Sequence, residues 1–323
     1  MPAGNIIIPG TFDSRDSIAD FFPRLETAME AIWAPRVAME LPSDREVEEL
    51  NWFGQVPQMR RWVGERHEEV LNKYALSVYN YPYESTIPIS VDDKRRDKTG
   101  QIATRLGELV TRTATHWNTL AGNYITAGEA GTIALAYDGQ WFFDTDHNES
   151  GSNQTNDLTA TEVPAANVAT TSTLTTTEAA DIITQTIAYM MTLTDDKGEL
   201  INQNPTEVLI LCTKAGHYAG LKNAIGLNNL GTGSGNNNPL LAWSEFTVNV
   251  QFVPTRITAA DKLYFFFGNP AMGSTPLIRT EEQGVQAEIK DDKFDNRREV
   301  FGVSSVRGMA YGMWQKAALV TLS

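Results

Sequence analysis

The longest regular pattern in the chain is helical and extends from Thr99 to Tyr124. Apolar residues recur there at steps of three and four, which is the spacing of one face of an α-helix. These residues are Ile102, Leu106, Leu109, Val110, Trp117, Leu120 and Tyr124. At about 1.5 Å per residue, the pattern predicts a helix roughly 35–40 Å long. Asp97 and Thr99 are the candidates for its N-terminal cap.

A second long pattern, from Tyr74 to Val91, alternates in the manner of a β-strand. Pro82 and Pro88 interrupt it, and a proline cannot donate a hydrogen bond to a neighbouring strand. The pattern therefore predicts an edge or protruding ribbon rather than a central strand. An exposed apolar ribbon promotes aggregation unless a partner covers it. We therefore expect this ribbon to pack on a neighbouring subunit rather than on its own core.

Between these patterns and the N-terminus lies an aromatic and basic segment, residues 51–66. One interpretation is a nucleic-acid patch in which arginines accompany stacking tryptophans. The other is a protein interface, where Trp and Arg are preferred anchors, and the acidic residues nearby favour it. The candidate subunit-interface residues are Trp52, Arg60, Arg61, Trp62, Arg66, Tyr79, Tyr81, Tyr83, Ile87 and Ile89.

The remaining patterns mix helices and strands and predict an α+β protein. Residues 1–15 are expected to be extended, and 16–33 to be helical, with Pro23 favouring a later helix start. Residues 148–177 indicate a long surface loop, and Thr175 with Glu178 forms a capping box that opens a helix. Further strands are predicted at 207–211, 246–253, 262–268, 276–289, 300–311 and 314–322, with a short helix at 214–225.

Charge excludes one broad class of function. The 323 residues contain 26 Lys and Arg against 40 Asp and Glu, a formal net charge of -14. No Lys or Arg occurs from Thr113 to Asp196. Tight binding to nucleic acid needs clustered basic residues, so this balance argues against it. With 41% hydrophobic residues, the composition is that of a soluble globular protein of about two domains.

The only cysteine, Cys212, cannot form an internal disulfide, and its apolar neighbours indicate a buried strand end. The N-terminus lacks the features of a signal peptide. No apolar run approaches the roughly 20 residues of a membrane span. We therefore expect a protein that is made and used in a reducing cytoplasm.

Candidate catalytic residues are few. The chain has four histidines, none at the spacing of a metal-binding helix, and it contains no phosphate-binding glycine loop or nucleophile motif. Asp144, Asp146 and His147 resemble a metal site, because carboxylates two residues apart on a strand face the same side. The alternative is that the carboxylates accept hydrogen bonds from turn amides and that His147 donates to a backbone carbonyl. We favour this alternative, and we expect no cofactor, no metal and no enzymatic activity.

Three segments together resemble the Mu-like prophage major head subunit family, which has the HK97-type capsid fold. They are WFGQVPQMRRWVGER (52–66) followed by YESTIPI (83–89), YDGQWFFDTDH (137–147) and FGVSSVRGMAYGMWQ (301–315). The resemblance implies an N-terminal arm, an extended loop, a peripheral domain with a long spine helix, and an axial α/β domain. The implied ranges are the arm at 1–50, the loop at 60–92, the peripheral domain at 51–59, 93–126 and 277–312 with its spine helix at 99–124, and the axial domain at 127–276 and 313–323.

The resemblance further implies a major capsid protein that assembles as hexamers and pentamers into the icosahedral shell of a tailed phage or prophage. Scaffold, portal and decoration proteins are its implied partners, together with packaged DNA that it faces without binding tightly. Its place would be the virion capsid, after assembly in the host cytoplasm. An acidic lumen would suit this role, because net charge sets non-specific binding to polyanions. Two alternatives remain open: a nanocompartment shell protein of the same fold, and a metal-dependent hydrolase using Asp144, Asp146 and His147.

Overall fold

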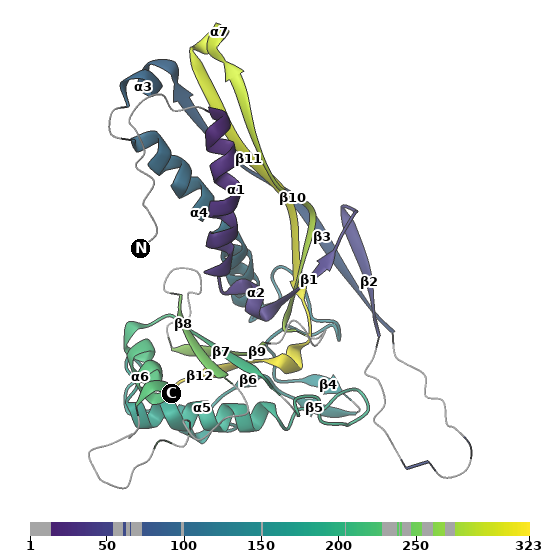
Figure 1. The fold of residues 1–323 in the computed structure, drawn as a ribbon. Helices are drawn as coiled ribbons and strands as arrows, with labels where there is room; N and C mark the ends of the chain where they lie inside the picture. The colour runs from purple at the N-terminus through teal and green to yellow at the C-terminus, as the bar shows by residue number, and fades with distance from the viewer. Residues whose placement is uncertain are drawn as a thin grey trace.

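A computed structural model of the chain describes residues 14–53, 61–62, 65, 73–97, 100–149, 151–203, 205–227, 238, 240, 247–253, 261–268 and 275–323. These residues form two parts that meet where the long helix ends (Figure 1). One part is elongated and contains a long twisted sheet. The other contains a second sheet with helices packed against it.

The first sheet has five strands in the order β1-β10-β11-β3-β2. Their bounds are Ala38–Pro42 (β1), Leu277–Asp292 (β10), Arg298–Tyr311 (β11), Lys73–Ser90 (β3) and Val47–Phe53 (β2). β1 runs parallel to β10, and the other pairs are antiparallel. The short helix α7 (Lys293–Asn296) closes the β10–β11 hairpin at the far tip. The two long strands predicted at 276–289 and 300–311 are confirmed.

Two helices lie along this sheet, α1 (Ser14–Glu30) and α4 (Gln101–Ala127). The predicted long helix is confirmed, and its apolar face is buried in the core with Phe21 and Phe301. The Asp97 carboxylate accepts hydrogen bonds from the backbone amides of Gln101 and Ile102 at 3.1 and 2.9 Å. This cap satisfies amides that no helix can pair internally. Thr99, the other candidate cap, lies outside the described residues.

Residues 14–42 are not an extended arm. α1 runs through Pro23, so a helix start after that residue is wrong. Phe21, Leu25 and Trp33 are buried in the same core as α4. α2 (Ala34–Val37) then leads into β1, which pairs with β10. The expected arm of 1–50 therefore belongs to the body of the molecule from residue 14, because its apolar stripe has a core to cover. Residues 1–13 lie outside the described part.

The second sheet has the order β6-β12-β9-β7-β8 and mixes parallel and antiparallel pairs. Its strands are Asp157–Leu158 (β6), Ala317–Thr321 (β12), Lys262–Gly268 (β9), Glu207–Cys212 (β7) and Thr247–Phe252 (β8). α5 (Thr176–Met190) and α6 (Ala215–Gly226) cover one face. The other face contributes Leu209, Tyr264 and Phe266 to the core of α1 and α4. Both faces are buried, which explains the continuous apolar runs in these strands.

Residues 148–177 do not form a long surface loop. They contain β4 (His147–Glu149), β5 (Ser152–Gln154), β6 and the short helix η1 (Pro164–Ala166). Leu158, Val163 and Ala166 are fully buried beside α5. The segment is rich in polar residues, so its composition predicted a loop although these three apolar residues belong to the core. The capping box at its end is confirmed, because the Thr175 hydroxyl accepts from the Glu178 backbone amide and the Glu178 carboxylate accepts from the Thr175 backbone amide.

The remaining elements are the short helix α3 (Val91–Arg96) and the short helix η4 (Trp314–Lys316). The strand predicted at 314–322 therefore begins later, as β12 at Ala317. Among the described residues, no helix combines the length and the apolarity needed to cross a membrane.

Candidate assembly surfaces

The predicted ribbon is a single 18-residue strand, β3, which changes partners near its middle. Residues 80–90 pair with β11, and residues 73–79 pair with β2. Pro82 and Pro88 lie opposite Val306 and Val300 of β11. β2 ends its pairing at Tyr79, so the other edge of β3 has no partner beside either proline within the described residues. The prediction of an edge position is therefore confirmed at both prolines.

The part of the ribbon that projects from the body differs from the expected loop of 60–92. Residues 80–90 belong to the main sheet, whereas β2 and residues 73–79 form a hairpin that extends from it (Figure 1). We call this element the β2–β3 hairpin. Leu76 and Val78 on one of its faces are buried against Ile278 and Ala310. Its opposite face carries Tyr79, which is 51% exposed.

Asn80 fixes the base of the β2–β3 hairpin. Its side-chain amide donates to the Ser43 hydroxyl at 2.6 Å and to the Arg45 carbonyl at 2.7 Å. Its backbone amide donates to the Glu46 carbonyl at 2.8 Å. Asn80 is only 3% exposed, so these bonds are shielded from water. They hold the connection between β1 and β2 against the point where β3 changes partners.

The predicted interface tyrosines divide into two groups. Tyr79 and Tyr81 are exposed, and their rings stack with centroids 6.4 Å apart. Tyr83 lies on the same face of β3, and its ring packs edge-on against the ring of His116 on α4, with the ring centroids 4.3 Å apart. Burial raises the pKa of Tyr83 above its ordinary value. Exposure therefore begins where α4 no longer covers the strand.

Tyr83 and Ile87 pack partly against the chain's own core, and Ile89 is half-buried. For Tyr83 and Ile87, the expectation that the ribbon packs on a neighbour rather than on its own core is wrong. The ring of His116 on the long helix covers part of Tyr83. Whether these side chains also contact a neighbour stays a prediction.

Only part of the predicted aromatic and basic segment lies in the described residues. Arg61 and Trp62 are exposed, and Trp62 has 71% of its surface accessible. Trp52 belongs to β2, and its side chain is not described. Arg60 and Arg66 lie outside the described residues. Their assignment to an interface stays a prediction.

Asp144, Asp146 and His147 do not converge on a common point. Asp144 accepts from the backbone amides of Thr145 at 2.7 Å and Trp141 at 3.3 Å, as the alternative interpretation predicted. Asp146 is exposed, and a hydrogen bond with Asp144 raises its pKa. The described residues hold no group of three or more His, Cys, Asp or Glu side chains that could bind a metal ion.

His147 is fully buried and pairs with a carboxylate rather than with a backbone carbonyl. Its Nδ1 lies 2.6 Å from an Asp138 carboxylate oxygen. Its ring stacks on Trp314 with centroids 3.9 Å apart and planes within 5°. Nearby, the Tyr137 hydroxyl donates to Glu149 at 2.5 Å and accepts from Gln315 at 2.7 Å. Two segments distant in sequence, 137–149 and 314–315, are thereby joined through a buried polar network.

A second buried contact joins α4 to the first sheet. Arg307 is 2% exposed, and its guanidinium lies 4.7 Å from the centre of the Trp117 ring. It donates to Glu281 at 3.0 Å and to the Thr113 carbonyl at 3.2 Å. Arg279 lies 5.2 Å from the same ring and pairs with Glu40. Burial lowers the pKa of Arg307, although the adjacent Glu281 opposes this.

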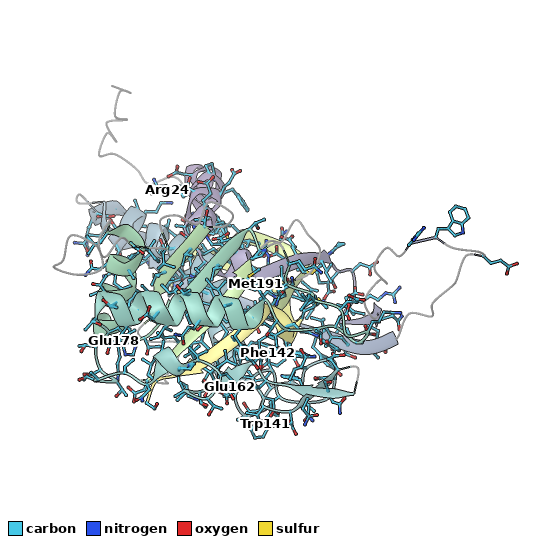
Figure 2. All side chains as sticks on the ribbon, turned by 90° about the horizontal axis from the view of Figure 1, so that it is seen from below. Arg24, Trp141, Phe142, Glu162, Glu178 and Met191 are labelled. Atoms are coloured by element: carbon cyan, nitrogen blue, oxygen red, sulfur yellow. The ribbon has the colours of Figure 1, made fainter. Side chains whose placement is uncertain are left out.

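Two exposed apolar features were missed by sequence reasoning. Ile133, Leu135 and Trp141 are each about half exposed, and Trp141 projects at the edge of the molecule while Phe142 points inward (Figure 2). Phe294, in α7 at the tip of the β10–β11 hairpin, is 100% exposed. No helical periodicity marks these residues, because Ile133, Leu135 and Trp141 lie outside any helix or strand and Phe294 lies in a helix of only four residues.

The architecture is shared with solved phage capsids. The asymmetric unit of the mature capsid of bacteriophage PhiM1 matches at a TM-score of 0.55 with 14% identity, covering 90% of this chain and 87% of that one. The capsid of Ralstonia phage GP4 matches at 0.53 with 11% identity, covering 87% and 85%. At such identities the likeness shows the fold alone. The protein has the HK97-type capsid fold, and the predicted α+β class is confirmed.

Sequence comparison supplies the family. Residues 17–177 match the family of the Mu-like prophage major head subunit gpT. Two curated relatives agree: the Mu-like prophage FluMu major head subunit of Haemophilus influenzae, 31% identical over 107 residues, and the major capsid protein of Escherichia phage Mu, 30% identical over 112 residues. These matches span 32% and 35% of this chain, and 34% and 36% of the relatives' lengths. Through residues 17–177, the chain belongs to the Mu-like prophage major head subunit family.

Proposed function

We propose that this protein is the major capsid subunit of a Mu-like phage or prophage and that many copies assemble into a closed shell. The observation that carries the proposal is the coincidence of two independent likenesses. The family match covers 17–177, and the match to a capsid fold covers 90% of the chain. The finer parts of the proposal are a shell built from hexamers and pentamers, scaffold, portal and decoration partners, and assembly in the host cytoplasm.

The surface of the described residues supports a role in assembly. The β2–β3 hairpin presents Tyr79 and Tyr81 to solvent, and Phe294 is fully exposed at the opposite tip. Large exposed aromatic side chains are enriched at protein interfaces because they bury much apolar area on contact. Burying about 400 Å² of such surface would contribute roughly 10 kcal/mol before the costs of association.

The proposed domain roles follow the architecture. α4 would be the spine helix of the peripheral domain, together with β3, β10 and β11. The second sheet with α5 and α6 would be the axial domain. The β2–β3 hairpin would be the extended loop, beginning earlier in the chain than the resemblance alone implied. The net charge of -14 suits a shell that encloses DNA without binding it tightly.

The two alternatives receive less support. A virus-like particle from Pyrococcus furiosus has a similar fold at a TM-score of 0.50 and 10% identity, so the fold alone does not separate a phage head from another shell. The family match favours the phage head. The hydrolase alternative required Asp144, Asp146 and His147 to act together, and His147 is instead buried against Asp138 and Trp314. We propose a structural role without enzymatic activity.

Expression of the full chain followed by light scattering and negative-stain electron microscopy tests the proposal. We expect capsomers or closed shells of uniform size. A stable monomer at every protein concentration and ionic strength would contradict it. A stoichiometric enzyme enclosed in shells purified from a bacterial host would favour the nanocompartment instead.

A further inference from the structure

The loop that follows α4 carries an apolar patch on its surface. Ile133, Leu135 and Trp141 are each about half exposed. Ala134 and Ala136, which alternate with the first two, pack against the core. The loop therefore turns Ile133 and Leu135 outward together, and Trp141 projects at the edge of the molecule (Figure 2). We call these three exposed side chains the Trp141 patch.

The chain holds the Trp141 patch in place from beneath. Phe142 and Phe143 are buried in the core directly after Trp141. A Cβ built on Gly131 would lie 2.6 Å from the Trp141 ring and 3.0 Å from a methyl group of Leu135. Both side chains therefore rest on the backbone of Gly131, which leaves them little freedom to move. A surface that is already ordered loses less conformational entropy when a partner binds.

Carboxylates without a compensating cation border the Trp141 patch. The Asp144 carboxylate accepts from the backbone amide of Trp141 at 3.3 Å, and a hydrogen bond joins Asp144 to Asp146. Within the part of the chain that the structure describes, neither carboxyl group has an ion-pair partner. No Lys or Arg occurs from residue 113 to residue 196, so the surrounding segment supplies no cation of its own.

Other acidic residues add to this charge. Glu129, Asp144 and Glu162 all raise the pKa of Asp157 electrostatically, although burial is the main cause of its rise. Lys262 opposes them, but its amino group is paired with Glu129 at 2.5 Å. The Trp141 patch therefore combines exposed apolar area with an excess of negative charge.

This combination suits a basic amphipathic helix. Aromatic and aliphatic anchors gain free energy when a partner covers them, and carboxylates form strong charge-assisted hydrogen bonds with Lys and Arg. A helix with an apolar stripe and flanking basic residues presents both groups on adjoining faces. Nucleic acid is a poor occupant, because its phosphates would be repelled. A second copy is also less suitable, because the chain carries a net charge of -14.

We propose that the Trp141 patch binds a basic amphipathic helix of another protein. The apolar face of that helix covers Ile133, Leu135 and Trp141, and its Lys or Arg side chains pair with Asp144 and Asp146. None of these residues belongs to the β2–β3 hairpin. The binding surface goes beyond the proposed function, because neither the apolar contact nor the ion pairs require a shell.

Fluorescence anisotropy of a labelled peptide with the full chain tests the binding. The probe is a synthetic helical peptide of about 18 residues, or about five turns, with leucines on one face and lysines on the other. We expect it to bind wild type with an affinity that falls as salt is added. The control peptide keeps the leucines and replaces every lysine with glutamate, and we expect it not to bind.

Two variants of the chain separate the apolar and the charged contributions. Trp141→Ser should weaken binding of the basic peptide by about tenfold or more. Asp146→Lys should weaken it by about fivefold and make the affinity less dependent on salt. Phe294→Ser is the matched control, because Phe294 is an exposed aromatic residue at the tip of the β10–β11 hairpin, and its affinity should equal that of wild type. Circular dichroism establishes that each variant is folded.

Equal affinity of wild type and Trp141→Ser for the basic peptide would overturn the inference, as would equal binding of the acidic peptide. If Trp141→Ser changed only the association of the chain with itself, the Trp141 patch would be a contact between copies and the inference would be wrong. Shells of a wild-type protein that binds no peptide would overturn the inference alone. Peptide binding by a chain that forms no shells would count against the proposed function alone.

Discussion

Thr280 and Asn80 lie on strands that are separated by β11, and the Thr280 hydroxyl donates to the Asn80 side-chain oxygen across it at 2.6 Å. Gly308 is in register with both residues and lies between them. A hydrogen bond can cross a central strand here only because that strand has no side chain at this point. The bond links β10 to the base of the β2–β3 hairpin, where Asn80 also holds Ser43 and Arg45.

Replacing Gly308 with alanine should destabilise the protein. The added Cβ would lie 2.4 Å from the Thr280 hydroxyl oxygen and 2.7 Å from the Asn80 side-chain oxygen, far inside contact distance. We expect a loss of about 1–3 kcal/mol in the free energy of unfolding, measured by urea denaturation. Gly302→Ala on the same strand is the control, since its nearest atom would be 3.6 Å away. Equal free energies of unfolding for the two variants would contradict the requirement for glycine beside the hydrogen bond between Thr280 and Asn80.

Gly220 of α6 should likewise tolerate no side chain. A Cβ there would lie 2.4 Å from the Leu174 carbonyl oxygen and 2.9 Å from its Cβ. Alanine normally stabilises a helix by about 1 kcal/mol relative to glycine. We nevertheless expect Gly220→Ala to lower the free energy of unfolding, because the clash with Leu174 outweighs this gain. Gly226→Ala, where nothing lies within 4 Å, should be neutral or stabilising. Thermal unfolding of both variants separates the two effects.

Lys316 should make stability rise with pH. Burial lowers its pKa from 10.5 to about 8, and its amino group donates to the Ile201 carbonyl at 3.3 Å. Between these two pKa values the folded state binds fewer protons than the unfolded state, so raising the pH favours folding. The slope from one such group is at most about 1.4 kcal/mol per pH unit.

Lys316→Met removes this amino group, so the free energy of unfolding of the variant should no longer increase with pH over this range. Urea unfolding from pH 8 to 9.5, with both proteins in the same assembly state, compares the slopes below the range in which tyrosines titrate. Parallel pH profiles for wild type and variant would show that burial of Lys316 does not affect its titration.

Cys212 should be unreactive while the protein is folded. The thiol is fully buried, and burial raises its pKa to about 12, so the nucleophilic thiolate is scarce at pH 8. We expect modification by a disulfide reagent to be slower by a factor of about one hundred or more than in urea. Because the chain contains a single cysteine, the reaction reports one site. Fast modification of the native protein would place the thiol at the surface.

Local patterns predicted many of the elements well. The strand β9 has the predicted bounds, and the capping box at Thr175 and Glu178 forms as expected. The capping box depends on interactions within a few residues, which a short stretch of sequence contains in full. β9 pairs with distant strands, but its continuous apolar run is typical of a strand that is buried on both faces. The interior of α4 was predicted for the same reason, since its apolar spacing alone defines which face is buried.

The candidate surfaces were predicted less completely because they depend on distant partners. Tyr79 and Tyr83 carry the same side chain in the same alternating pattern, but α4 covers only Tyr83. Likewise, His147 is adjacent in sequence to the carboxylates with which it was grouped, and its actual partner is Asp138. A spacing rule identifies which residues share a face but does not reveal what packs on that face.

By itself, the sequence determined the long helix, the edge character of the proline-bearing strand, the buried strands of the second sheet and the family to which residues 17–177 belong. Only the tertiary structure decided what surrounds the point where β3 changes partners, because Asn80 contacts Thr280 and Gly308 there, and both are at least two hundred residues away. It also decided which tyrosines remain exposed. Periodicity and proline act through local backbone geometry, whereas exposure and pairing are set by segments that only folding brings together.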